Sequence, residues 1–381
     1  MKKYFLVVAS FFIYSHISLG QVYPGQMDST FVPVRSHHYD PELTFDFCVN
    51  EPAWSNQAGI HSAFGSTDRL YFRKEVPVNH DNDLSSSYST TVWRGERANA
   101  QILVWSSEAL EQVRVSTQDL RSAEGNIIPK DRITFELVRY VLSNYPYAEK
   151  KAICGESPYK SGFLMPDRFE TLDRFDLPSQ TTRPVWMLVD VPRGTAPGTY
   201  KGQVEVRAKG KAPQLLNLEI VVQNQLLPYP KDWKYRLDLW QNPWAVAWYN
   251  HVEPWSPEHK MLLKQHLKHY ADAGGTYITT YGVHSPWSDN SYMIEGGMIE
   301  WIKKADGTWA FDYKIFDEYV ELAMECGIDE AITLYTPIPW GFRHRYKDEA
   351  TGDYSYINWA PSSEEFKKMW NIFLTDFKFH L

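Results

Sequence analysis

The sequence predicts a β-sandwich at residues 21–227, followed at residues 228–381 by an incomplete (β/α)8 TIM-type barrel. Two patterns support this fold class. Short runs of β-forming residues separated by turn signals fill residues 87–223, and strand-like and helix-like segments alternate after Trp233. The length of 381 residues agrees with about two domains.

The sandwich prediction rests on segments in which β-formers recur, several of them with alternating polarity. In the last of these segments Leu216, Leu218, Ile220 and Val222 share one face, and 209–211 is a tight turn before it. Two prolines in 226–232 mark the expected domain boundary. The expected strands are 91–97, 100–105, 113–116, 136–141, 184–192, 203–208 and 215–222.

Arg94, Glu96 and Arg97 stand together between two of these segments. They could form a charged site, but an ion-paired strand end is the simpler interpretation, and we adopt it.

The second domain is predicted from three strand–helix pairs. Gly274-Gly275 and Gly327 end the first two helices. Residues 298–311 are typical of a hairpin that turns at Asp306-Gly307. The expected strands are 235–240, 276–281 and 331–335, and the expected helices are 257–273, 316–326 and 362–379.

Repeated strand–helix pairs indicate a parallel sheet. A closed barrel of eight pairs needs about 250 residues, whereas about 150 remain after Trp233. We therefore expect a barrel truncated within its third helix. The alternative is a shorter, open α/β domain.

The N-terminus has the features of a secretory signal peptide at residues 1–20. Two lysines precede an apolar stretch at 4–17, and small residues at 18 and 20 suit cleavage before Gln21. A transmembrane anchor is the alternative, but the stretch is short for one and polar residues follow it. We expect export to the periplasm or beyond the cell, with no anchor after cleavage.

The composition and charge of the chain argue against some classes of partner and cofactor. The net charge of −8 argues against nucleic acid as a partner. Aromatic residues make up 15% of the chain, which suits either a large core or flat platforms for sugar rings. Cys48, Cys154 and Cys326 are too few and too scattered for a disulfide framework or a zinc site. No metal or organic cofactor is expected.

Aromatic and polar side chains follow each predicted barrel strand. The sites of such barrels lie at the C-terminal ends of the strands, and sugar pockets combine apolar platforms with a few polar groups. We expect about half of these aromatics to pack the rim instead. The candidate substrate-binding residues are Trp240, Gln241, Asn242, Tyr281, His284, Trp287, Tyr335 and Trp340.

The carboxylates do not form an obvious catalytic pair. Asp329-Glu330 precedes the third strand, at the wrong end of the barrel, and is expected to be a solvated loop pair. Asp238 lies within the first strand, where it would support the site or be ion-paired. Asp289, Glu295 and Asp348 lie in loops without clear partners. His284 could be a general acid, although a hydrogen-bond donor is the commoner role.

Several segments together resemble glycoside hydrolase family 123. They are Trp93-Arg94-Gly95-Glu96-Arg97, Arg183-Pro184-Val185-Trp186, Pro197-Gly198-Thr199-Tyr200, 237–243, and Tyr335 through Pro339-Trp340. The resemblance covers nearly the whole chain after residue 20. It implies a β-sandwich fused to a (β/α)8 barrel and exo-β-N-acetylgalactosaminidase activity on glycans with terminal N-acetylgalactosamine.

The resemblance also implies a substrate-assisted, retaining mechanism. The 2-acetamido oxygen of the substrate attacks the anomeric carbon, an Asp orients the acetamide, and the adjacent Glu protonates the leaving oxygen. In the family this pair follows a later barrel strand, so we expect it beyond Leu381 and assign no catalytic residue here. The chain as given is then expected to be inactive.

Two other interpretations stay open. The chain could be a non-catalytic, secreted glycan-binding protein that uses the same aromatic platform. It could also be a gene remnant that does not fold, because an open barrel would expose a sheet edge and apolar helix faces.

Overall fold

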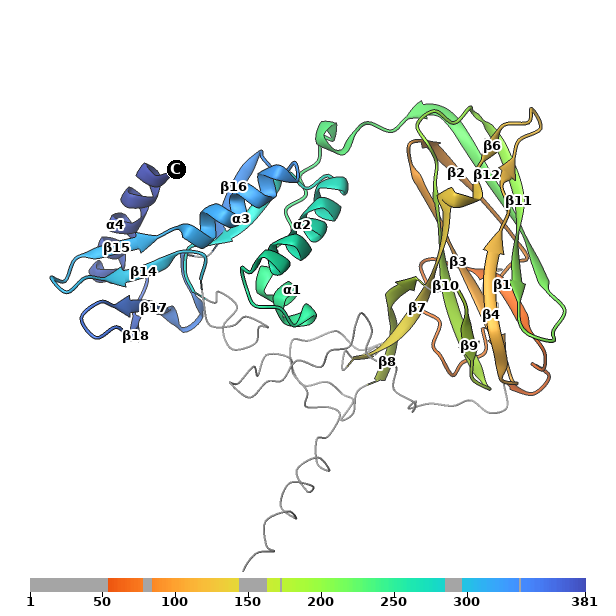
Figure 1. The fold of residues 1–381 in the computed structure, drawn as a ribbon, viewed down its shortest axis with the longest axis horizontal. Coiled ribbons are helices and arrows are strands. Elements are labelled where there is room, and N and C mark those ends of the chain that lie inside the picture. The colour runs from red at the N-terminus through yellow and green to blue at the C-terminus, as the bar shows by residue number, and fades with distance from the viewer. Residues whose placement is uncertain (1–53, 78–83, 144–162, 172, 285–296, 336) are drawn as a thin grey trace, which may run out of the picture. The chain divides into compact units, whose positions relative to one another are not determined.

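The computed structural model describes residues 54–77, 84–143, 163–171, 173–284, 297–335 and 337–381 (Figure 1). The predicted signal peptide therefore lies outside the described residues. The described chain divides between Leu227 and Pro228 into two compact units. Each unit is described by itself.

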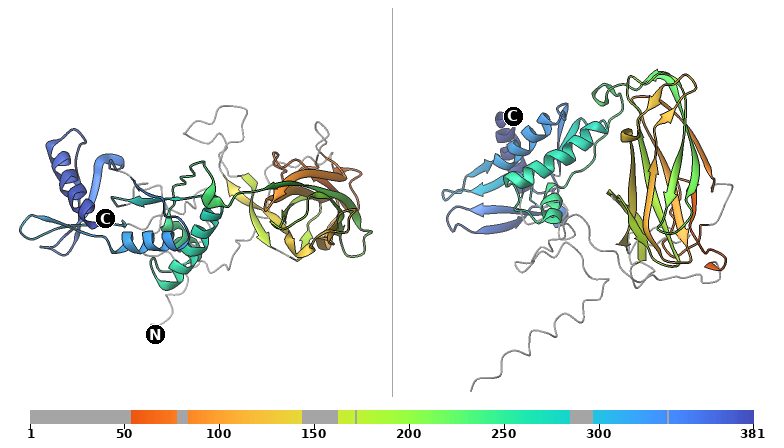
Figure 2. Two further views of the ribbon diagram at one scale, coloured as in Figure 1. Left: turned by 90° about the horizontal axis from the view of Figure 1, so that it is seen from above. Right: turned by 45° about the vertical axis from the view of Figure 1, so that its right-hand side comes forward.

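The N-terminal unit consists of two sheets around one core (Figures 1 and 2). One sheet has the order β1 (His61–Gly65), β3 (Arg97–Ser106), β10 (Thr181–Asp190), β7 (Ile133–Ser143) and β8 (Phe163–Thr171). The other has the order β2 (Ser87–Arg94), β12 (Gln214–Leu226), β11 (Gly198–Arg207), β4 (Leu110–Thr117) and β9 (Phe175–Leu177), and β5 (Leu120–Arg121) joins it beside β6 (Ile127–Ile128). The short 3-10 helix Lys130–Arg132 precedes β7.

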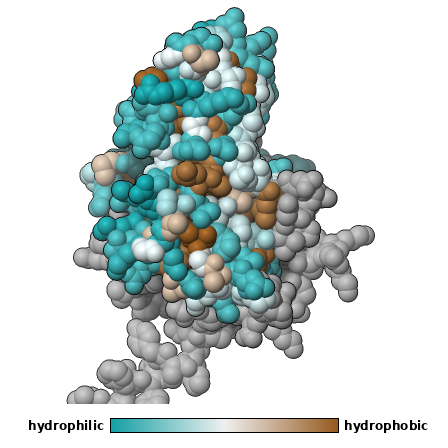
Figure 3. Space-filling model, turned by 90° about the vertical axis from the view of Figure 1, so that its right-hand side faces the viewer, coloured by the Kyte–Doolittle hydropathy of each residue, from teal (hydrophilic) through white to brown (hydrophobic). Residues whose placement is uncertain are grey.

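Alternation of side chains builds this core, because successive residues of a strand point to opposite faces. Strand β12 shows this alternation. Its buried side chains are Leu216, Leu218, Ile220 and Val222, whereas Leu215, near the start of the same strand, is exposed. The hairpin expected from 203 to 222 is confirmed, with Glu205 opposite Leu215. On the face shown in Figure 3, hydrophobic side chains form only small patches among hydrophilic ones.

Glu96 and Arg97, at the connection of β2 to β3, form polar contacts that stabilise the strand ends. Arg97 Nε lies 2.5 Å from Asp190 Oδ1, and Glu96 Oε2 accepts a hydrogen bond from the Trp93 N–H at 2.7 Å. The Arg97–Asp190 pair is largely exposed and contributes at most about 1 kcal/mol. The simpler of the two interpretations of this cluster therefore fits the structure.

In its described residues, the C-terminal unit combines four α-helices with two small sheets (Figure 1). Parallel strands β13 (Tyr277–Tyr281) and β16 (Ala331–Tyr335) form one sheet. The other has the order β15 (Trp309–Asp312), β14 (Glu300–Lys303), β17 (Arg343–Asp348) and β18 (Tyr354–Asn358). The α-helices are α1 (Pro243–Asn250), α2 (Pro257–Asp272), α3 (Lys314–Glu325) and α4 (Glu364–His380), with 3-10 helices at Pro230–Asp232 and Trp340–Phe342.

The expected strand at 235–240 is wrong. Only Leu237 forms a β-bridge there, a parallel one to Gly275. A strand needs a neighbour over several residues, and this segment has one at Leu237 alone among the described residues. Trp240, at its end, is 57% exposed. Among the described residues of this unit, β13 and β16 form a separate two-stranded parallel sheet, and no closed barrel is present.

The sequence also missed two features of this unit. Helix α1 begins where the Asn242 side chain accepts a hydrogen bond from the Ala245 N–H, with Pro243 at its first position. The hairpin β17–β18 turns near Gly352, whose φ is +80°. Each feature has a signal in the local sequence: Asn242-Pro243 marks the start of α1, and Gly352 marks the turn of the hairpin.

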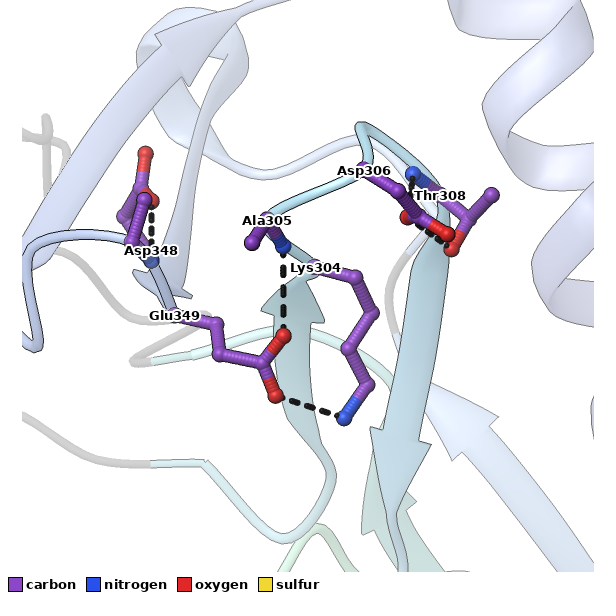
Figure 4. Close-up of polar contacts among 7 residues, drawn as sticks. Lys304, Ala305, Asp306, Thr308, Asp348 and Glu349 are labelled. Carbon is purple, nitrogen blue, oxygen red and sulfur yellow. Dashed lines mark hydrogen bonds and ion pairs between the residues drawn. The ribbon is translucent and has the colours of Figure 1, made fainter.

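Glu349 connects the two hairpins of the four-stranded sheet (Figure 4). Its carboxylate accepts hydrogen bonds from Lys304 Nζ at 2.9 Å and from the Ala305 N–H at 3.1 Å. The predicted turn at Asp306-Gly307 is confirmed, and Asp306 Oδ1 accepts hydrogen bonds from the N–H and the hydroxyl of Thr308.

Most aromatic side chains of this unit form its core. Trp301 lies at the centre, stacked on Phe373 at 4.8 Å between ring centroids, and its indole N–H donates to the Gly282 carbonyl at 2.8 Å. His344 is 2% exposed within the same cluster. The high aromatic content is therefore explained here largely by packing.

Candidate functional site

The first and third predicted strand ends meet at Trp240 and Tyr335. Their ring centroids are 4.6 Å apart, with the rings tilted by 43°. Trp240 is exposed and Tyr335 is half-buried. The pair forms a partly open aromatic surface beyond the C-terminal end of β16.

Asp238 ties this surface to both parallel strands. Its Oδ1 accepts a hydrogen bond from Thr279 Oγ1 at 3.1 Å, and its Oδ2 accepts one from Thr333 Oγ1 at 3.2 Å. Thr279 and Thr333 are register partners in β13 and β16. Of the two roles left open for Asp238, the structure favours support by hydrogen bonding, since no ion pair forms at this side chain within the described chain.

Gln241 and Asn242 are engaged with the scaffold. Gln241 Oε1 accepts a hydrogen bond from the Thr279 N–H at 3.2 Å, and its carbonyl accepts one from the Tyr281 hydroxyl. The Asn242 side-chain oxygen caps α1. These contacts hold the segment after Trp240 against the end of β13.

Tyr281 differs from expectation because it is fully buried. Its ring stacks on Trp244 of α1 at 5.7 Å, with an interplanar angle of 20°. With no exposed surface, Tyr281 packs the interior in this structure and offers no platform to a sugar.

His284, which follows β13, contacts strands β17 and β18. Its Nδ1 accepts a hydrogen bond from the Arg345 N–H at 3.0 Å, and its ring meets the edge of Tyr356 at 5.5 Å. An accepting Nδ1 places the proton of the neutral ring on Nε2. This geometry fits a positioned hydrogen-bond donor better than a general acid.

Two other predicted site residues cannot be placed. Trp287 lies outside the described residues. Trp340 lies in the 3-10 helix Trp340–Phe342, and only its backbone is described. The role of all the predicted residues in sugar binding stays a prediction.

Asp329-Glu330 lies at the start of β16, whereas Tyr335 lies at its end. Glu330 accepts hydrogen bonds from Thr276 Oγ1 at 2.8 Å and the Tyr277 hydroxyl at 3.0 Å, and these bonds lower the pKa of its carboxyl. A general acid needs a raised pKa. Both position and protonation therefore argue against this pair as the acid–base machinery.

The other carboxylates considered add no pair. Asp289 and Glu295 lie outside the described residues. Asp348 Oδ1 accepts a hydrogen bond from the Ala350 N–H at 3.0 Å, which stabilises the β17–β18 turn.

Three further observations concern metals, cysteines and membranes. Within the described chain, no three His, Cys, Asp or Glu side chains are grouped to hold a metal ion. Cys326 is buried, and burial raises the pKa of its thiol; Cys48 and Cys154 lie outside the description. No described helix combines the length and apolar character needed to cross a membrane.

Sequence reasoning missed Thr279 and Thr333, the two hydroxyl donors to Asp238. Threonine is an ordinary strand residue, so nothing in the sequence distinguishes these two. Only the register of β13 against β16 identifies them.

Two family descriptions match the chain. Residues 64–208 match the glycoside hydrolase 123 N-terminal domain, and residues 240–381 match the glycoside hydrolase 123 catalytic domain. No curated protein matches the chain.

A solved structure from Clostridium perfringens, a family 123 glycoside hydrolase studied for glycolipid glycan hydrolysis, is similar to this chain. The identity is 25% and the TM-score 0.74 over 85% of this chain and 56% of that one. The chain thus spans a little over half the length of that relative.

A PapD-like domain of human CEP192 also matches, at 12% identity over 49% of this chain and 99% of that domain, but its TM-score of 0.23 supports no functional argument. The two domain matches and the Clostridium structure agree with the motifs of the sequence. The chain belongs to glycoside hydrolase family 123.

Proposed function

We propose that this chain binds terminal β-linked N-acetylgalactosamine of glycans at the surface formed by Trp240 and Tyr335. The exposed Trp240 ring, held against Tyr335 and beside Asp238, is the observation that carries the proposal. An indole face accepts the apolar C–H face of a pyranose, and nearby polar groups fix its hydroxyls.

The proposal for the chemistry is substrate-assisted hydrolysis with retention. The acetamide oxygen of the bound sugar would attack the anomeric carbon while an Asp-Glu pair orients the acetamide and protonates the leaving oxygen. We assign neither member of that pair among the described residues. The proposed task of the described residues is to hold the sugar.

Fold and location complete the proposal. Strands β13 and β16 would be successive strands of a (β/α)8 barrel, whose sites lie at the C-terminal ends of its strands. The N-terminal segment would direct export, which places the protein where extracellular or periplasmic glycans occur.

Titration calorimetry with methyl β-N-acetylgalactosaminide tests the binding. Trp240→Ala should weaken binding by at least about fivefold, because the stacking surface is lost. Trp93→Ala is the matched control, since Trp93 is a similarly exposed tryptophan of the other unit. Equal affinities of Trp240→Ala and the unsubstituted chain would refute the proposed surface.

A second test concerns the carboxylates. Glu330→Gln should leave both sugar affinity and any turnover of an aryl β-N-acetylgalactosaminide unchanged. Loss of turnover in Glu330→Gln would overturn the exclusion of this pair.

The alternative function is glycan binding without catalysis. It is favoured by one observation, that both oxygens of Asp238, the carboxylate near the described aromatic surface, are already engaged by the hydroxyls of Thr279 and Thr333. Sugar affinity that depends on Trp240, without any turnover, would support this alternative.

A further inference from the structure

A cavity of about 420 Å³ lies in the C-terminal unit. Its wall includes Glu253 and Trp255 from the α1–α2 connection, Asp312 from the end of β15, Lys314 from the start of α3, and Arg345 from β17. Its volume falls in the range typical of small-molecule sites, about 300–1,000 Å³.

Opposite charges line this cavity without pairing across it. Glu253, Lys314 and Arg345 form no ion pair with any described residue, although all three contribute to the same wall. Asp312 Oδ1 only accepts a hydrogen bond from the Lys314 N–H, at 2.9 Å. Elsewhere in the wall the Tyr354 hydroxyl donates a hydrogen bond to Glu300 Oε2 at 3.0 Å, so the charges of the wall without an ion-pair partner among the described residues include those of Glu253, Lys314 and Arg345.

Trp255 is held in the wall in a strained conformation. Its φ of +64° lies in the left-handed region, which is rare for a bulky residue. The fully buried His259 stabilises it, because His259 Nδ1 accepts the Trp255 N–H at 2.8 Å while Nε2 donates to the Pro243 carbonyl at 2.9 Å. Strain of this kind is concentrated at functional sites.

Two donors in the wall lack an acceptor. The Trp255 indole N–H and Arg345 Nε are shielded from solvent and have no partner among the described residues. Such groups cost free energy that an incoming acceptor would recover.

Arg345 is also positioned for recognition. Its guanidinium lies over the Tyr354 ring at 3.6 Å, and its backbone N–H is bound to His284. Arg343, two residues earlier on the same strand, stacks on Tyr356 at 3.5 Å in the same way but does not line the cavity. The two arginines therefore form a matched pair.

We propose that this cavity is a second saccharide-binding site, whose lining shares no residue with the Trp240 surface. A sugar hydroxyl both donates and accepts hydrogen bonds, so a polyhydroxylated ring can bridge the separated carboxylates and cations. Trp255 and Tyr354 supply aromatic surface. Trp244 lines the cavity and stacks on the buried Tyr281, and Arg345 of the same wall is bound through its backbone N–H to His284. The inference rests on the proposed glycan function, since it assigns a second contact for the same class of ligand.

Calorimetric titration with a neutral trisaccharide ending in β-N-acetylgalactosamine tests the site. Arg345→Gln removes the positive charge and the Nε–H donor, and Trp255→Phe removes the indole N–H, while each keeps a planar group at its position. Each should weaken binding by about tenfold. Arg343→Gln should bind like the unsubstituted chain. Near-ultraviolet circular dichroism of each variant establishes that it is folded.

The outcomes separate this inference from the proposed function. Binding that falls in Trp240→Ala but is equal in Arg345→Gln, Trp255→Phe and Arg343→Gln would overturn the second site alone. Absence of trisaccharide binding by the unsubstituted chain would overturn both. A loss in Arg343→Gln as large as that in Arg345→Gln would assign the effect to the strand rather than to the cavity, and would also overturn the inference.

Discussion

At the scale of single residues, exposure decides which aromatics are free to bind a ligand. Trp240 and Tyr281 both end predicted strands and look equivalent in the sequence, yet one is 57% exposed and the other fully buried. The difference arises because α1, which the sequence analysis missed, places Trp244 on Tyr281. Sequence alone therefore gives candidates for a site, while the packing of neighbouring elements selects among them.

His344 gives a prediction for pH. Burial lowers the pKa of His344 from 6.5 to about 4, in spite of a hydrogen bond from its ring to the Phe342 carbonyl. The unfolded chain then binds more protons between pH 6.5 and 4. The free energy of unfolding should fall as the pH falls through this window, by up to about 1.4 kcal/mol per pH unit.

Urea unfolding followed by tryptophan fluorescence from pH 4 to 7 measures this contribution. His344→Phe keeps an aromatic ring among Trp301, Trp359 and Trp370 but cannot be protonated. Its pH slope should be smaller than that of the unsubstituted chain. The lowered pKa of His259 contributes equally in both proteins, so identical slopes would contradict the role assigned to His344.

Asp238 gives a prediction for stability. Asp238→Ala leaves the buried Thr279 hydroxyl and the Thr333 hydroxyl without their acceptor, and should cost about 1–3 kcal/mol. Asp329→Ala is the control, because Asp329 is an exposed loop residue. Chemical denaturation of both variants measures the difference, and equal stability of the two would show that the Asp238 contacts contribute little.

At the scale of elements, local signals in the sequence predicted several helices and strands correctly. The helices at α2, α3 and α4 and the strands β13 and β16 were predicted because apolar spacing and glycine stops are local signals. The segment 235–240 has a strand-like composition but only one bridge, to Gly275. Strand formation depends on a neighbour, which composition does not reveal.

Gly275 is where that segment meets β13, and it gives a prediction for the element. A Cβ at this position would overlap the Tyr270 ring, whose hydroxyl donates to the Leu237 carbonyl at 2.6 Å. Gly275→Ala should therefore cost about 1–3 kcal/mol by overpacking. Thermal unfolding measures the change.

Gly194→Ala is the matched control, because a Cβ there meets no atom within 4 Å and its φ is outside the left-handed region. It should change stability by less than about 0.5 kcal/mol. A Gly275→Ala variant as stable as Gly194→Ala would show that Tyr270 moves aside at no cost.

At the scale of the whole molecule, the two units have separate cores. The core of the sandwich draws on β-strands of both its sheets, and the core of the C-terminal unit is built from aromatic side chains such as Trp301 and Phe373. The change of rhythm after Trp233 predicted this organisation, since each unit has its own hydrophobic periodicity. Residue-level contacts such as Asp238 with its two threonines were beyond prediction, because they depend on the register between strands distant in sequence.

Separate cores predict two unfolding transitions in scanning calorimetry. Leu218 is buried in the sandwich, so Leu218→Ala should destabilise that unit by about 2–5 kcal/mol and lower only one transition. Gly275→Ala should lower only the other, by roughly 2–4 °C for each kcal/mol lost. The assignment follows from the location of each residue in a different core. A single transition that both substitutions shift would show instead that the two units unfold as one cooperative structure, and that the division at Leu227 and Pro228 has no thermodynamic counterpart.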